Sequence, residues 1–224
     1  MHSLVVGNGE VGTSLGEVLG CEVLGETTEK RECDVLHICF PYSYKFGKEV
    51  KRYQQLYNPK YTIVHSTVPI GCCQGLGVYH SPIRGMHPNL AQSIKTFVTY
   101  LAPENRELKN YLESYGMKIE LVKKPRNTEA LKLFDTTYYL WNILFEKMLY
   151  AYCKEYNLDY QLIYKKANET YNEGYVRLGK PEVQRPVLKH IEGKVGGHCI
   201  IPNAEMLEKS SEIAKLCLNL NEAL

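Results

Sequence analysis

The first twelve residues constrain the fold of this chain more than any other stretch. An apolar run, Ser3–Val6, leads directly into GNGEVG, and residues 11–19 then show helical periodicity. Gly7, Gly9 and Gly12 have the GxGxxG spacing. In this pattern the first glycine permits a tight turn, the second lets backbone touch a pyrophosphate, and the third lets helix and strand pack closely. The pattern predicts a dinucleotide site at the helix N-terminus; the alternative is a purely structural glycine turn.

Short apolar runs alternate with helical segments through the rest of the first half. Further strands are expected over residues 21–24, 34–40, 61–65, 77–80, 97–101 and 117–122, and helices over 45–56 and 103–115. Alternation of this kind predicts an α/β fold with a Rossmann-type doubly wound parallel sheet. We expect this dinucleotide-binding domain to span residues 1–122 and a smaller all-helical domain to span 123–224.

Residues after the strands are candidates for contact with the cofactor. Glu26 lies about twenty residues beyond the first glycine, where an acidic side chain bonds the adenosine ribose. Because a carboxylate repels a 2′-phosphate, NAD is favoured over NADP, although Lys30 and Arg31 lie close by; the alternative is a solvated Glu26. Thr67 follows the fourth strand, and its alternative role is a turn-capping hydroxyl. The other candidates are Asn8, Glu10, Val11, Pro41 and Tyr42.

The longest expected helix covers residues 127–156. Its middle, TTYYLWNILF, is apolar nearly all round, so it should be buried on several sides, which favours a homodimer interface along this helix. This apolar run is too short to span a bilayer. A helix is expected over 158–167, an irregular polar loop over 168–186, which contains Gly174, Gly179 and Pro181, and a last helix over 204–218.

Cys199 is a candidate nucleophile near the end of the chain, in the stretch GKVGGHCIIPN. Gly196 and Gly197 open access to the thiol, and backbone N–H groups can polarise it; the alternative is a loop with a buried thiol. His198 precedes it and is a further catalytic candidate. Lys132 could stabilise a developing alkoxide or act as a general acid, unless it is a solvated helix lysine.

Two residues of the HSPIRGMHPNL segment are candidates for contact with a substrate. Arg84 could bind an anionic substrate through two hydrogen bonds. His87 is a possible acid–base group at neutral pH. The alternatives are a surface ion pair for Arg84 and a loop-capping role for His87.

Four of these stretches resemble the nucleotide-sugar 6-dehydrogenases, the family that oxidises UDP-glucose, GDP-mannose or UDP-N-acetylmannosamine. They are the glycine turn, STVP with Thr67, EALKLF with Glu129 and Lys132, and GKVGGHC with Cys199, and together they cover roughly residues 3–205. The resemblance implies that NAD oxidises a primary alcohol twice, to a carboxylate. It implies that Thr67 lies beside the nicotinamide, that Lys132 stabilises the oxyanion, and that Cys199 forms a thiohemiacetal and then a thioester.

Three positions depart from this family. Its glutamate, asparagine and aspartate are replaced by Ile83, Thr136 and Asn203, and its second nucleotide-binding domain is absent from this sequence. Thr136 and Asn203 remain candidates for substrate contact. Two alternatives therefore stay open. One is a two-electron dehydrogenase, similar to the 3-hydroxyacid and 6-phosphogluconate dehydrogenases, that does not use Cys199. The other is an NAD-binding protein without catalysis.

Composition narrows the class of partner. The net charge of +2 gives no reason to expect nucleic acid or a membrane surface, so a small-molecule substrate, such as a sugar or nucleotide sugar, is expected. Eight cysteines occur without a CxxC pair, so no metal site is expected. From the sequence MHSLVVGNG no signal peptide is expected, and reduced thiols in the cytoplasm are the simplest interpretation.

Overall fold

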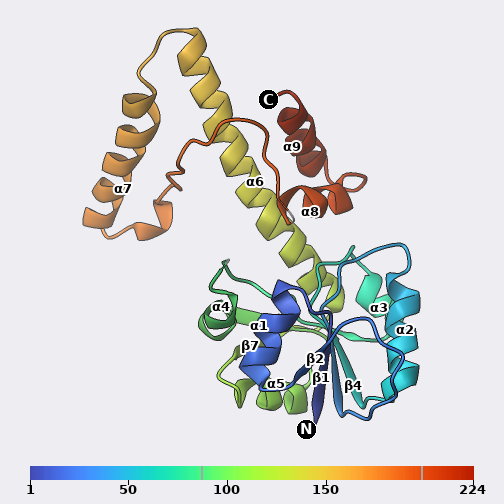
Figure 1. Cartoon of the computed structure of the whole chain (residues 1–224). Helices are drawn as coiled ribbons and strands as arrows, with labels where there is room; N and C mark the ends of the chain where they lie inside the picture. Colours follow the sequence, from blue (N-terminus) through green and yellow to red (C-terminus); the bar gives the residue numbers. More distant parts are fainter. Residues whose placement is uncertain (87, 198) are drawn as a thin grey trace. The chain divides into compact units, whose positions relative to one another are not determined.

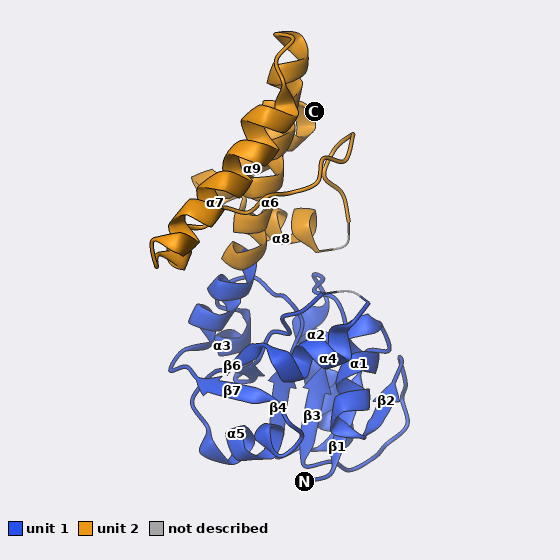
Figure 2. Ribbon diagram, turned by 90° about the vertical axis from the view of Figure 1, so that its left-hand side faces the viewer, with its two compact units in different colours: residues 1–133 blue, residues 134–224 orange. Residues whose placement is uncertain are grey.

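The computed structural model describes residues 1–86, 88–197 and 199–224, which form two compact units (Figure 2). Unit 1 covers Met1–Leu133 and unit 2 covers Phe134–Leu224. The last strand of unit 1 ends at Leu121, and unit 1 continues beyond it to Leu133. The long helix α6 (Pro125–Glu155) begins in unit 1 and continues in unit 2, so the division between the units falls inside this helix.

Five parallel strands form the centre of unit 1, in the order β2-β1-β3-β4-β5 (Figure 1). The chain adds β2 on one side of β1 and then β3 and β4 on the other, so the strand order reverses beside β1. This is the doubly wound Rossmann-type arrangement that the sequence predicts. The strands are β1 (Ser3–Val6), β2 (Glu22–Leu24), β3 (Val35–Ile38), β4 (Tyr61–Val64) and β5 (Tyr79–His80).

Helices cover both faces of this sheet because its central strands are apolar on both sides. Val5 and Val35 pack on one face against α1 (Glu10–Leu19), α4 (Leu90–Thr96) and α5 (Arg106–Glu113). Leu4 and Leu36 pack on the other face against α2 (Phe46–Tyr57) and α3 (Cys72–Leu76). Alternate residues of each strand therefore enter different cores, as the pleat requires.

The remaining two strands of unit 1 form a small parallel sheet of their own. They are β6 (Val98–Leu101) and β7 (Lys118–Leu121), joined to β5 by an antiparallel bridge between His80 and Ala102. All seven expected strands are therefore present, in two sheets. In the chain between β6 and β7, helix α5 begins at Arg106, three residues later than expected. The reason is Asn105, whose side chain accepts a hydrogen bond from the Leu108 N–H and caps the helix there.

Three of the histidines that the structure describes in unit 1 are fully buried: His37, His65 and His80. Nδ1 of His65 donates to the Ser81 carbonyl (2.7 Å), so its Nε2 accepts from Nδ1 of His37 (2.9 Å). His80 lies 2.7 Å from the Thr128 hydroxyl. Burial lowers the pKa of His65 to about 4 and the pKa of His80 to about 3, so both rings are neutral at pH 7.

Unit 2 contains the rest of α6 and the helices that follow it. These are a π-helical turn (Gln161–Lys166), α7 (Ala167–Arg177), a short 3₁₀ turn (Pro181–Val183), α8 (Ile200–Leu207) and α9 (Glu212–Glu222). A small core joins α6 to α8 and α9 through Leu140, Leu144, Ala204 and Cys217. None of the helices among the described residues has the length and hydropathy needed to cross a lipid bilayer.

The expected loop over residues 168–186 is wrong for its first half. α7 runs to Arg177 and passes through Gly174, because one glycine inside a helix costs only about 1 kcal/mol. The helix ends where the sequence provides a stop signal: Gly179 has φ +70° and Pro181 follows. The single expected last helix is likewise two helices, α8 and α9, separated before the capping residue Ser211.

Candidate dinucleotide site and cysteine loop

The three glycines of the GNGEVG turn differ in what surrounds them. A Cβ on Gly7, where φ is +113°, would lie 2.7 Å from the backbone of Cys39 and Phe40, and a Cβ on Gly12 would lie 1.7 Å from the Gly7 carbonyl oxygen. These two glycines are therefore required by packing within the protein. A Cβ on Gly9 would meet nothing within 4 Å. The space beside Gly9 at the start of α1 fits the close approach of a phosphate.

Residues that follow β1, β3 and β4 gather at the same edge of the sheet because these strands are parallel neighbours. Gly7 and Gly9 follow β1, Pro41 and Tyr42 follow β3, and Thr67 follows β4. Asn8 lies against Gly25, since a Cβ on that glycine would be 3.3 Å from the Asn8 amide nitrogen. Glu10 and Val11 begin α1 at this edge. The fold thus brings the predicted cofactor-contacting residues of three separate segments to one edge.

Glu26 lies just beyond β2, with an exposed side chain. The loop around it is held by Arg52, whose guanidinium donates to the Thr27 carbonyl (2.9 Å). Arg31 pairs with the carboxylates of Glu22 and Glu29. Its charge is therefore partly neutralised by its own neighbours.

Lys132 lies near the start of α6, and its ammonium donates to the carbonyl of Ile83 (2.9 Å). The Ile83 side chain is buried in the core of unit 1. The position at which the resembled family has a glutamate is therefore a core residue here. Arg84, the next residue, lies with its guanidinium 6.0 Å from the ring centre of Tyr100.

Glu129 was matched in the sequence only as part of a motif, and its structural role was missed. Its buried carboxylate accepts hydrogen bonds from the backbone N–H groups of Gly71 (2.5 Å) and Cys73 (2.7 Å) at the start of α3. These N–H groups have no partner inside their own helix. Glu129 thus ties the first turns of α6, which carry Lys132, to the loop after Thr67. Sequence spacing does not show this contact, because the partners are about sixty residues apart.

Cys199 lies in unit 2, directly before α8, with an exposed side chain. All eight cysteines are among the described residues, and the other seven are buried or partly buried. The side-chain amide of Asn203 on α8 is buried and donates to the Thr136 hydroxyl on α6 (3.2 Å). Two of the positions that depart from the resembled family therefore contact each other. His87 and His198 lie outside the described residues.

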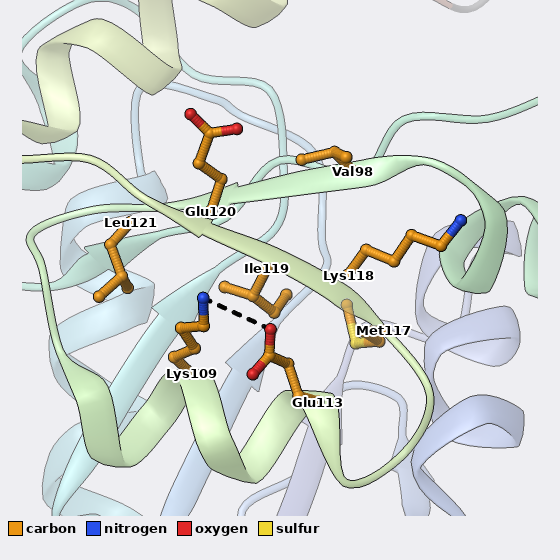
Figure 3. Close-up of a pocket in the computed structure, with 8 residues that line it drawn as sticks. All are labelled: Val98, Lys109, Glu113, Met117, Lys118, Ile119, Glu120 and Leu121. Carbon is orange, nitrogen blue, oxygen red and sulfur yellow. Dashed lines mark ion pairs between the residues drawn. The ribbon is translucent and has the colours of Figure 1, made fainter.

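One surface depression of unit 1 lies away from the candidate cofactor and catalytic residues. Figure 3 shows an open depression lined by residues of α5, β6 and β7, with the Lys109 ammonium 3.5 Å from the Glu113 carboxylate. It contains none of the candidate residues. Among the described residues, no group of three His, Cys, Asp or Glu side chains is arranged to hold a metal ion.

No protein-family model matches this sequence, and no curated protein is similar to it in sequence. Solved structures resemble it closely in fold. A UDP-D-ManNAc dehydrogenase from Pyrococcus horikoshii superposes with a TM-score of 0.76 at 14% identity, over 99% of this chain and 68% of that one. A UDP-glucose dehydrogenase from Pyrobaculum islandicum gives 0.73 at 14% identity, over 100% and 68%.

A third similar structure is a 3-hydroxyisobutyrate dehydrogenase from Mycobacterium tuberculosis, with a TM-score of 0.71 at 13% identity, over 100% of this chain and 93% of that one. At these identities the likeness establishes the fold. The nucleotide-sugar dehydrogenases indicated by the motifs are thus among the proteins that share this fold, together with a hydroxyacid dehydrogenase.

Proposed function

We propose that this protein is an NAD-dependent oxidoreductase that acts on a CH–OH group of a small-molecule substrate. The open space at Gly9, beside the reversal in strand order and at the start of α1, is the observation that supports this proposal most strongly. The nicotinamide cofactor, when bound, accepts a hydride. Gly7, Gly9 and the first turn of α1 would hold its phosphates, and Thr67 would lie near the reacting carbon.

NAD is preferred over NADP in this proposal. Glu26 follows β2, where its carboxylate can accept hydrogen bonds from ribose hydroxyls and would repel a 2′-phosphate. Arg31, a cation that could favour NADP, is paired with Glu22 and Glu29. A phosphate would have to compete with both carboxylates for this guanidinium.

Cys199 is the proposed nucleophile in a four-electron reaction. The alcohol first loses a hydride and a proton to become an aldehyde, with Lys132 stabilising charge on the oxygen. The Cys199 sulfur then bonds to the aldehyde carbon, and the oxygen takes up a proton. Loss of a second hydride and a proton leaves a thioester, and water breaks its C–S bond to release the acid and the thiol. Two NAD are reduced for each substrate molecule.

A two-electron dehydrogenase that does not use Cys199 is the second candidate. The observation in its favour is Ile83, because a core isoleucine brings no acid–base group for the hydrolytic step. The hydrogen bond between Asn203 and Thr136 also favours the two-electron reaction, since neither side chain is a carboxylate that could assist hydrolysis.

Turnover assays distinguish these candidates. Nucleotide sugars and small hydroxy acids would be offered with NAD, and the amount of NADH formed per substrate consumed would be measured. Two NADH per substrate, with loss of acid formation in Cys199→Ala but not in the partly buried control Cys21→Ala, supports the covalent reaction. One NADH per substrate with Cys199→Ala fully active supports the two-electron reaction. No NADH with any substrate would contradict both.

We also propose that two copies of the chain associate through α6. Large apolar side chains are exposed on this helix at spacings of three, four and seven residues: Phe134, Tyr138, Phe145, Met148 and Tyr152. An exposed apolar stripe of this kind is typical of a helix–helix interface. Helix α7 also contains no buried residue, so its surface is likewise open to a second copy of the chain.

A further inference from the structure

Residues 191–195, which precede Cys199, form neither helix nor strand, yet a buried lysine binds this segment. Lys147 on α6 is only 6% exposed. Its ammonium donates to the carbonyl oxygens of Ile191 and Gly193, the latter at 2.7 Å. Lysine is almost never buried unless its charge is compensated. The carbonyls of this segment supply acceptors for that charge, so Lys147 and the segment fix each other.

A second buried side chain holds the next part of the segment. Asn221 on α9 accepts a hydrogen bond from the Val195 N–H (2.7 Å) and donates to the Val195 carbonyl (3.0 Å). Its side chain thus satisfies both backbone groups of one residue. Val195 is thereby fixed to α9, four residues before Cys199.

A third anchor lies on α6 beside Lys147. The buried carboxylate of Glu146 accepts hydrogen bonds from the Tyr160 hydroxyl and from Nδ1 of His190 (2.8 Å). The His190 ring also stacks on Tyr150, with 3.6 Å between ring centres. His190 is therefore held directly before the residues that Lys147 contacts.

Cys199 lies between two fixed points of the chain. Val195 is bound to α9 four residues earlier, and Asn203 is bound to Thr136 four residues later. Gly193 and Gly197 have φ of +82° and +97°, which lets the chain turn on either side of Val195. The exposed thiol thus lies on a short loop whose two ends are held by buried side chains.

We propose that Lys147 and Asn221 are positioning residues that hold Cys199 in its reactive place at the start of α8. This proposal rests on the covalent form of the proposed function. A displacement of about 1 Å at a reacting group can cost about 100-fold in rate. Release of the segment should therefore lower kcat much more than it changes cofactor binding.

Hydrogen–deuterium exchange and kinetics on the full chain test this role. The variants are Lys147→Met and, on the other helix, Asn221→Leu; Lys154→Met, an exposed lysine on α6, is the matched control. Both variants should exchange the amides of residues 194–197 and 199–201 at least about tenfold faster than the control. They should also lower kcat by about 100-fold with the KM for NAD within about twofold. Lys147→Arg, which keeps donors at this position, should recover part of the lost kcat.

Exchange that stays at the control level in a folded variant would overturn the anchoring. Faster exchange with kcat unchanged would overturn the positioning role. If Lys147→Met does not fold, Asn221→Leu carries the same test from α9. The exchange comparison needs no substrate, so it tests the anchoring independently of the proposed function. A failure of the proposed function would instead be seen as absent turnover or as full activity of Cys199→Ala.

Discussion

Glycine is needed at positions 9 and 12 for different reasons: Gly12 for packing within the protein and Gly9 for the proposed cofactor. Substitutions at the two positions should therefore have different effects on stability. A Cβ on Gly12 would overlap the Gly7 carbonyl at 1.7 Å, so the helix or the strand would have to move. We expect Gly12→Ala to lower the free energy of unfolding by about 3 kcal/mol or more. Gly9→Ala should change it by less than about 1 kcal/mol, because its Cβ enters open space. Urea denaturation of both variants checks this, and equal losses would contradict the packing account.

Glu26 offers a test of cofactor choice at the same scale. Its exposed carboxylate should favour NAD by repelling the 2′-phosphate of NADP. We expect Glu26→Ala to lower the ratio of the NADP dissociation constant to the NAD dissociation constant by about tenfold, mainly because NADP binds more tightly. Binding titrations with both cofactors measure this ratio. Glu29→Ala is a less suitable control, since it frees Arg31; Glu32→Ala is the better one. An unchanged ratio would mean that Glu26 is a solvated loop residue.

Among the elements, α6 makes the most specific prediction. Its stripe of exposed aromatic and aliphatic side chains should be buried in a homodimer. We expect Phe145→Glu to convert a dimer to a monomer, because a carboxylate would be desolvated at the centre of the interface. Sedimentation velocity measures the change, with Lys154→Glu as a control on the same helix. A wild-type protein that is monomeric at micromolar concentration would contradict the proposal.

The sequence predicts the elements of unit 1 well and their side-chain contacts poorly. Strands 3–6 and 61–65 were clear because buried parallel strands are continuous apolar runs. α7 was missed because Gly174 resembles a loop signal although helices tolerate it. The anchors Glu129 and Lys147 were missed for another reason: each binds backbone atoms more than forty residues away in the sequence, and neither periodicity nor spacing indicates such contacts.

At the scale of the whole molecule, the buried histidines make stability depend on pH. The folded-state pKa values of His65 and His80 lie near 4 and 3, below the ordinary value of 6.5. Below pH 6.5 the unfolded chain therefore binds protons that the folded chain does not, and stability falls as pH falls. From pH 7 to pH 4, His65 alone should remove about 3 kcal/mol. Urea unfolding at several pH values measures this loss.

A variant isolates the histidine contribution. His80→Gln should be less stable at pH 7, since it loses the contacts to Thr128 and the Ser66 carbonyl, but its stability should fall less steeply between pH 6.5 and 4. His2→Gln, at an exposed position, is the control. The same unfolding free energy at pH 6.5 and 4.5 in the wild type would contradict this account.

The central claim is that the edge of the sheet beside Gly9 binds a nicotinamide dinucleotide. The most direct measurement is a fluorescence titration with NADH of the wild type, Gly9→Val and, as a control in unit 2, Gly174→Ala. We predict saturable binding to the wild type and the control, and binding at least about tenfold weaker to Gly9→Val at an unchanged Tm. Absence of binding to the wild type, or equal binding to Gly9→Val, would contradict the claim.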